Sequence, residues 1–156
     1  MSTRRLALRA CVVAAAAMTM PAWAARTLSL PRPRSLASEL ERALGARKVL
    51  VVLINLKGCP YCKLVRESYL VPLLGSGQPV IQIELERSIA LADLRSRAST
   101  HAQVVREFGI RFAPTVLFIG RAGAEAAPRL EGIASPDFYG AYLQERVDSA
   151  NRSVAG

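Results

Sequence analysis

Residues 48–69 read KVLVVLINLKGCPYCKLVRESY, and this stretch decides the fold of the chain. The apolar run from Val49 to Ile54 is too short for a helix of its own and is rich in β-branched residues, so it predicts a buried strand. The run breaks at Gly58, after which apolar residues recur at helical spacing. Two cysteines, Cys59 and Cys62, therefore lie where a buried strand turns into a helix.

The N-terminus has the form of an export signal. Residues 1–24 carry three arginines and no acid, then an apolar run from Cys11 to Met20 and a small-residue pattern that ends at Ala24. This run is too short to span a bilayer comfortably, which disfavours an uncleaved anchor. We expect cleavage near Ala24 and Ala25 and a periplasmic mature protein. The paired arginines at positions 4 and 5 leave both the general secretory and the twin-arginine routes open.

Cleavage would leave two of the three cysteines, because Cys11 departs with the signal. Both remaining cysteines belong to the Cys59–Cys62 pair. A disulfide across so short a loop removes little entropy from the unfolded chain, so the pair is a poor structural crosslink. In an oxidising compartment, such a pair is more typical of a working redox couple.

The chain is basic, with a formal net charge of +9. The basic residues are scattered along the chain, without long runs and without interleaved aromatic residues, so the sequence does not favour nucleic-acid binding. A basic surface still favours acidic partners or the anionic face of a membrane by electrostatic steering.

Composition and periodicity divide the mature chain into an extended arm over residues 25–34, one domain over residues 35–149 and a tail over residues 150–156. The elements expected in the domain are a helix over 35–46, the strand from 49, the dithiol helix to about 70, a strand over 79–86, helical pieces over 87–99 and 100–109, strands over 116–119 and 128–133, and a last helix over 135–149.

The connections between these elements predict how the strands pair. The long crossover between the first two strands requires a parallel pair, while the short connection over residues 121–127 suits an antiparallel hairpin. The order therefore predicts an α/β domain, a mixed sheet with helices on both faces. We expect the segment 87–99 to be an elaborated crossover rather than a specificity element.

The two cysteines have different expected roles. Cys59, at the first turn of a helix, faces unpaired N–H groups and the positive end of the helix dipole, which favour its thiolate. Cys62 lies one turn deeper on the same face, close enough to form a disulfide but shielded. We therefore expect Cys59 to attack and Cys62 to resolve. Pro60 stiffens the turn, and Tyr61 offers an apolar face beside the sulfur.

A lone C-x-x-C pair has alternative meanings, among them half of a zinc site and a copper-binding pair. Zinc requires four ligands, and the only histidine, His101, lies within a predicted helix without a companion cysteine or histidine. We therefore expect no bound metal, and we expect His101 at the surface.

This arrangement resembles the thioredoxin family. Besides the strand that leads into C-x-x-C, residues 111–115 (RFAPT) precede a strand at the place where the family carries a cis-proline, and residues 130–143 (LEGIASPDFYGAYL) match its closing strand and helix. The resemblance implies a thioredoxin-like mixed four-stranded sheet. It also implies a cis Pro114 beside the Cys59 sulfur and an Ala113 backbone that pairs with a bound substrate strand.

Two positions depart from the family pattern. Gly58 stands where thioredoxins have a tryptophan, and Leu53 stands where they have a buried acid. The proton route to Cys62 is therefore expected to use another acid, such as Glu67, or water.

The Pro-Tyr dipeptide between the cysteines is the one found in glutaredoxins, but the closing segment differs. The signal, the lone dithiol and the closing segment together resemble periplasmic thioredoxin-like proteins, including those associated with sulfur oxidation and cytochrome c maturation.

The resemblance implies a thiol–disulfide oxidoreductase that needs no cofactor beyond its own Cys59–Cys62 disulfide. We expect it to reduce disulfides of partner proteins as a monomer, with electrons from a membrane thiol transporter. Four residues are expected to hold the substrate: Pro60, Tyr61, Ala113 and Pro114. The alternatives are an oxidase or isomerase for folding proteins and a copper-binding module with the same fold.

Overall fold

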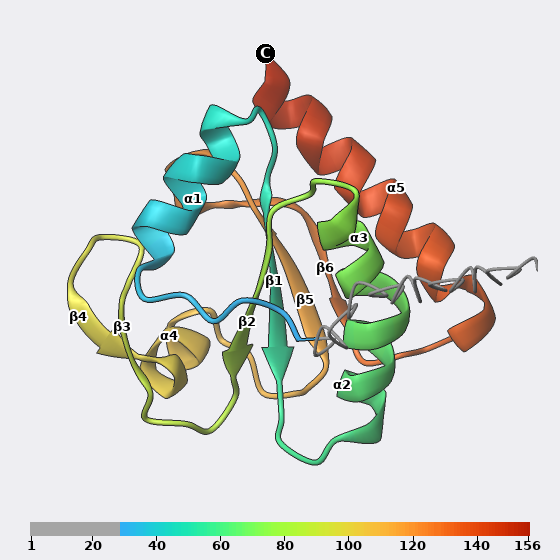
Figure 1. Cartoon of the computed structure of the whole chain (residues 1–156), viewed down its shortest axis with the longest axis horizontal. Coiled ribbons are helices and arrows are strands. Elements are labelled where there is room, and N and C mark those ends of the chain that lie inside the picture. The colour runs from blue at the N-terminus through green and yellow to red at the C-terminus, as the bar shows by residue number, and fades with distance from the viewer. Residues whose placement is uncertain (1–28) are drawn as a thin grey trace, which may run out of the picture.

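A mixed four-stranded sheet forms the centre of the molecule (Figure 1). The computed structural model describes residues 29–156, so the predicted signal over 1–24 and the first part of the predicted arm lie outside the described residues. The strand order is β2 (Val80–Glu84), β1 (Leu50–Asn55), β5 (Thr115–Ile119) and β6 (Glu125–Glu131). β1 pairs parallel with β2 and antiparallel with β5, which in turn pairs antiparallel with β6. The predicted mixed sheet is confirmed.

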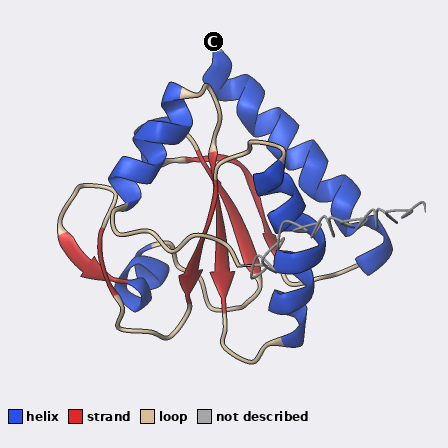
Figure 2. Cartoon of the chain, viewed as in Figure 1, coloured by secondary structure: helices blue, strands red, loops and turns tan. Residues whose placement is uncertain are grey.

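Helices cover both faces of this sheet, as Figure 2 shows. In chain order they are α1 (Leu36–Gly45), α2 (Pro60–Leu64), the π-helical η1 (Val65–Leu70), α3 (Val71–Gly75), α4 (His101–Glu107), the short 3-10 helix η2 (Arg121–Gly123) and α5 (Pro136–Ala155). The dithiol helix and α5 lie on one side of the strands, and α1 and α4 lie on the other (Figure 1).

Strand β1 is buried along its whole length because both of its faces are covered. Successive side chains of a strand point to opposite faces. Val51 and Leu53 accordingly pack with η1 and α5, whereas Leu50, Val52 and Ile54 pack with α1 and α4. Each large aliphatic side chain buried in this way contributes on the order of 2 kcal/mol to folding. The central strand therefore holds the two layers of helices together.

The dithiol helix runs further than predicted. It continues through η1 and α3 to Gly75, although the sequence predicted an end near Leu70 because Pro72 follows. A proline inside a helix lacks an N–H group, and its ring crowds the carbonyl of the preceding turn. The wider π-helical turn just before it, in which the Val71 N–H group bonds to the Arg66 carbonyl, accommodates Pro72 without breaking the helix.

The prediction of a helix over residues 87–99 was wrong. This segment holds two short strands, β3 (Ala90–Ala92) and β4 (Ala98–Thr100), which pair as an antiparallel hairpin. Asp93 organises the turn, because its Oδ1 accepts hydrogen bonds from the backbone N–H groups of Arg95 at 2.8 Å and Arg97 at 2.9 Å. Such bonds from an aspartate to nearby backbone compete with helix formation.

His101 is buried, so its prediction as a surface residue was also wrong. It is the first residue of α4, has 0% of its surface exposed, and accepts a hydrogen bond through Nδ1 from the Glu84 N–H group at 3.0 Å. This bond joins the start of α4 to the end of β2. Burial lowers the pKa of His101 below its ordinary value, so the imidazole is neutral in the folded protein.

Residues 29–34 of the predicted arm are extended but are packed on the domain. Leu30 is buried in the core, and the carbonyl of Pro31 accepts a hydrogen bond at 2.9 Å from the N–H group of Gln82 in β2. The carbonyl of Arg34 likewise accepts from Ala92 in β3 at 2.8 Å. The arm therefore links the main sheet to the β3–β4 hairpin.

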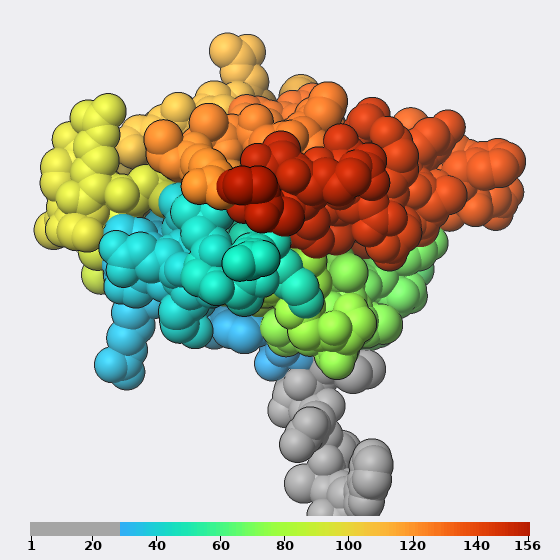
Figure 3. Space-filling model, turned by 90° about the horizontal axis from the view of Figure 1, so that it is seen from above, coloured from blue at the N-terminus to red at the C-terminus, as the bar shows by residue number. Residues whose placement is uncertain are grey.

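The last helix extends to Ala155, so residues 150–155 belong to α5 rather than to a separate tail. Ala150 and Val154 are buried, and the Asn151 Oδ1 atom accepts a hydrogen bond from the Val49 N–H group at 2.9 Å. The end of α5 thus lies beside the end of α1 (Figure 3). No helix in residues 29–156 has the length and apolar character needed to cross a membrane.

We predict that His101 makes folding stability depend on pH. The unfolded imidazole binds a proton as the pH falls below its ordinary pKa of 6.5, whereas the buried imidazole resists protonation. The stability that the neutral His101 contributes is therefore fully present above this pKa and is lost as the pH falls. Between about pH 7.5 and 5.5, we expect the free energy of unfolding to fall by up to about 1.4 kcal/mol. Denaturant unfolding at several pH values measures this change.

The matched variant is His101→Asn, because an asparagine Oδ1 atom can accept the bond from Glu84 but does not titrate. We expect the variant to lose less stability than the natural protein over the same pH interval. Equal losses in the two proteins would contradict the assignment to His101.

Candidate active site

The turn between β1 and α2 sets the position of the first cysteine. Gly58 has a φ of 80°, which side chains with a Cβ atom rarely adopt, so a glycine suits this turn better than the tryptophan of thioredoxins. The Cys59 N–H group then bonds to the Leu56 carbonyl at 3.1 Å. Cys59 caps α2, because its sulfur accepts a hydrogen bond from the Cys62 N–H group at 3.3 Å. Pro60 occupies the first turn of the helix.

The two cysteines differ in exposure. Both are free thiols; Cys59 is partly exposed, whereas Cys62 has 0% of its surface exposed. Burial, and after it the hydrogen bond to Cys59, raise the pKa of the Cys62 thiol to about 12. Arg66 and a backbone bond with Leu56 act in the opposite direction. At neutral pH Cys62 is therefore a protonated thiol beneath an accessible one.

The loop before β5 lies against the first cysteine. The Cys59 sulfur is 4.0 Å from the carbonyl oxygen of Ala113, and the Ala113–Pro114 peptide bond is cis. Two aromatic side chains near this contact are exposed, Tyr61 at 61% and Phe112 at 63%. The sequence analysis did not include Phe112 among the substrate-binding residues. The only signal for it was an aromatic residue at the end of a predicted loop.

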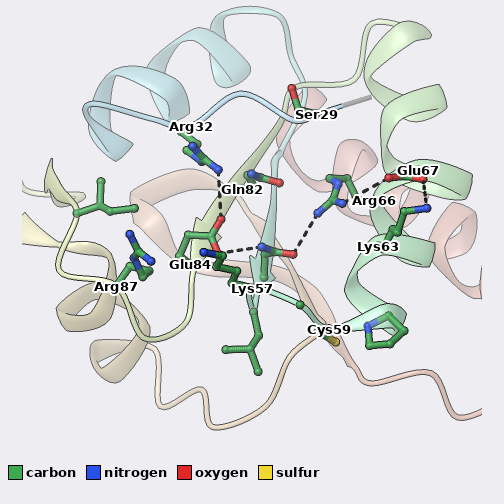
Figure 4. Close-up of a pocket in the computed structure, with 15 residues that line it drawn as sticks. Ser29, Arg32, Lys57, Cys59, Lys63, Arg66, Glu67, Gln82, Glu84 and Arg87 are labelled. Carbon is green, nitrogen blue, oxygen red and sulfur yellow. Dashed lines mark hydrogen bonds and ion pairs between the residues drawn. The ribbon is translucent and has the colours of Figure 1, made fainter. Parts of the chain in front are cut away.

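A cavity of about 760 Å³ opens on the other side of Cys59, between the ends of β1 and β2 and the dithiol helix (Figure 4). It contains none of Tyr61, Phe112, Ala113 and Pro114. Ten of its fifteen lining residues have polar or charged side chains: Ser29, Arg32, Asn55, Lys57, Lys63, Arg66, Glu67, Gln82, Glu84 and Arg87. The other five are Leu56, Gly58, Cys59, Pro60 and Ile89.

A chain of polar contacts runs across this cavity (Figure 4). Asn55 donates through Nδ2 to Glu84 at 2.8 Å, and its Oδ1 atom accepts from Arg66 at 3.3 Å. Glu67 forms ion pairs with Arg66 at 3.5 Å and with Lys63 at 3.1 Å. The chain therefore connects the buried end of β2 to the helix that carries the cysteines.

Asn55 and Glu84 were also missed in the sequence. They are register partners at the carboxyl ends of the parallel strands β1 and β2, and both are buried. The available signal was the change from apolar to polar residues where each predicted strand ends. Neighbouring parallel strands bring such residues together.

Among the described residues, no hydrogen bond supports the expected proton route from Glu67 to Cys62. The hydrogen bond from Lys63 lowers the pKa of Glu67, so this carboxylate is ionised, and no hydrogen bond joins it to Cys62 in the described part of the chain. Leu53, at the position of the family's acid, is fully buried in apolar surroundings. Among residues 29–156, no group of three or more histidine, cysteine or acidic side chains is arranged to hold a metal ion.

Several known structures are similar to this chain at low sequence identity. The periplasmic thioredoxin SoxS of Paracoccus pantotrophus, in its reduced form, is 20% identical, with 66% of this chain and 99% of that chain covered and a TM-score of 0.43. Thioredoxin O2 of Arabidopsis thaliana, in its oxidised state, is 14% identical, with 77% and 92% covered and a TM-score of 0.49. A thioredoxin of Thermus thermophilus is 20% identical, with 74% and 84% covered and a TM-score of 0.48.

A comparison with curated protein sequences gives no match. In contrast, residues 36–146 match the family described as the thioredoxin-like domain, which covers the sheet, the C-x-x-C turn and most of α5. The resemblance predicted from the sequence is thereby confirmed. The chain belongs to the thioredoxin-like domain family.

Proposed function

We propose that this protein is an exported thiol–disulfide oxidoreductase that reduces disulfides of partner proteins in the periplasm. The family supports thiol–disulfide exchange as the activity. The observation that carries the proposal is the stacking of an accessible thiol, Cys59, over a buried protonated thiol, Cys62, next to the Ala113 carbonyl.

In the proposed reaction the Cys59 thiolate bonds to one sulfur of a substrate disulfide. The substrate S–S bond breaks, its other sulfur leaves as a thiolate and takes up a proton, and a mixed disulfide forms. Cys62 then loses its proton and bonds to the Cys59 sulfur, which releases the second substrate thiolate. The substrate has gained two electrons, and the Cys59–Cys62 disulfide has formed.

The raised pKa of Cys62 gives these steps an order. Part of the rise comes from the hydrogen bond and charge of Cys59, which the mixed disulfide removes. The influences that lower the pKa, from Arg66 and Leu56, persist in that intermediate. Burial, the largest cause of the raised pKa, also persists, so Cys62 ionises more readily after Cys59 has reacted but remains harder to ionise than an exposed thiol.

The surface around Cys59 suits an extended protein segment. Tyr61 and Phe112 offer exposed aromatic faces, and the backbone of Ala113, next to Pro114, lies close enough to the sulfur to pair with the substrate chain. Large exposed aromatic residues are typical of surfaces that bind proteins. With Pro60 at the turn, these residues form the proposed substrate site.

Reduction of partner disulfides is the direction that we propose, and its alternative is oxidation. Strongly oxidising members of such folds stabilise the reduced form by stabilising a thiolate. Burial disfavours ionisation of Cys62, so a thiolate that made this protein a strong oxidant would have to form at Cys59. Electrons for each cycle would come from a membrane thiol transporter.

The second candidate is an oxidase or isomerase that uses the same residues. Copper retained after purification would instead support a copper-binding module.

A Cys62→Ser variant should accumulate mixed disulfides with partner proteins, because the resolving thiol is absent. The complexes are detected on non-reducing gels of periplasmic extracts and identified by mass spectrometry. The matched control is Cys59→Ser, which should trap nothing. Absence of thiol-sensitive complexes in the Cys62→Ser sample would contradict the exchange mechanism.

If the protein is a reductase, its reduction potential should lie near that of thioredoxin, about −270 mV, because a strong oxidant requires a reduced form that is stabilised. Equilibration with dithiothreitol buffers, followed by alkylation of free thiols, measures it. A value roughly 100 mV or more higher would identify the protein as an oxidase instead.

In a Cys59→Ser variant, Cys62 should stay un-ionised up to its ordinary pKa of 9.0, since burial persists when its neighbour is replaced. The absorbance of the thiolate near about 240 nm reports the titration. Ionisation near neutral pH would show that Cys62 is not protected by burial.

A further inference from the structure

The cavity beside Cys59 has an excess of positive charge. Its basic side chains are Arg32, Lys57, Lys63, Arg66 and Arg87. Its acidic side chains are only Glu67 and Glu84. In Figure 4 the basic groups surround the space from both walls, with Arg32 and Arg87 opposite Lys63 and Arg66.

The two acids are already engaged. Glu84 receives the hydrogen bond of Asn55 and lies 3.8 Å from Arg32, while Glu67 is shared between Lys63 and Arg66. Within residues 29–156, Lys57 and Arg87 have no ion-pair partner. The cavity therefore retains positive charge for an anionic ligand, next to a nucleophilic sulfur.

The wall of the cavity also carries an unsatisfied buried polar atom. Gln82 is only 4% exposed, and its Oε1 atom has no hydrogen-bond partner in the described part of the chain. Only an N–H or O–H donor satisfies such an acceptor, so Gln82 does not itself attract a carboxylate. The attraction for an anionic ligand comes from the basic side chains of the cavity.

The cavity and the proposed protein-binding surface meet at Cys59 and Pro60. Lys57, Gly58 and Cys59 line the cavity, whereas Ala113 lies against the sulfur from the other surface. A small disulfide can therefore have its sulfur at Cys59 and its charged end in the cavity, without occupying the aromatic surface.

We propose that this cavity binds the carboxylate end of a small organic disulfide, which the Cys59–Cys62 pair then reduces. This inference rests on the proposed thiol–disulfide activity. The Cys59 thiolate bonds to one ligand sulfur, and the other ligand sulfur leaves as a thiolate. The Cys62 thiolate then bonds to Cys59 and releases the second ligand thiolate. The dithiol gives up two electrons, and the small disulfide becomes two thiols.

Three symmetrical disulfides of similar length test the charge preference: 3,3′-dithiodipropionate with two carboxylates, bis(2-hydroxyethyl) disulfide without charge, and cystamine with two ammonium groups. The rate at which each oxidises the reduced mature protein is divided by its rate with dithiothreitol, which removes intrinsic differences in reactivity. We expect the carboxylate probe to react about tenfold faster than the neutral probe and cystamine to react slowest. Added salt should reduce these differences.

The variant Arg87→Gln should lower the preference for the carboxylate probe several-fold and leave the normalised rate of the neutral probe unchanged. The matched control is Arg152→Gln, which removes an exposed arginine at the far end of α5 (Figure 1) and should keep the full preference. The unchanged neutral rate shows that the variant is folded and that its thiols react normally.

The outcomes separate the two proposals. If all three normalised rates are equal, or if Arg87→Gln keeps the preference, the cavity is not the binding site and the thiol–disulfide activity still stands. If none of the probes oxidises the protein, the proposed function itself is wrong.

Discussion

Burial of strand β1 on both faces is the constraint on which the rest of the structure depends. Its alternate side chains anchor helices on opposite sides, so the strand has no face left for chemistry. The chain reaches the surface only after the strand has ended, and there it turns sharply at Gly58 to enter α2. Cys59, the proposed nucleophile, is placed at this turn, where a rigid strand fixes its position and the start of a helix provides its hydrogen bond.

The same geometry places a second set of polar residues beside the cysteines. Because β1 and β2 are parallel and in register, Asn55 and Glu84 lie side by side at the same edge of the sheet. Arg66 connects them to the dithiol helix. In this protein, charged groups therefore lie around the site at the sheet edge, while the position of the usual buried acid belongs to the apolar core as Leu53.

The sequence predicted the main sheet well and the connecting segments less well. Long apolar runs such as β1 leave few alternatives to a buried strand, and a long crossover leaves only the parallel pairing. The segment 87–99 was misjudged because its apolar residues also fit a helical spacing. The turn at Asp93, whose side chain bonds to the backbone of the following residues, decided in favour of the hairpin.

The sequence by itself determined the position of the dithiol at the strand-to-helix turn, because cysteine spacing and local periodicity are properties of neighbouring residues. Only the tertiary structure decided the surroundings of that dithiol. The buried His101, the cavity with Arg87 and the contact of Ala113 with Cys59 join residues far apart in the chain. Their proximity follows from strand order and helix packing, and local spacing along a sequence does not encode it.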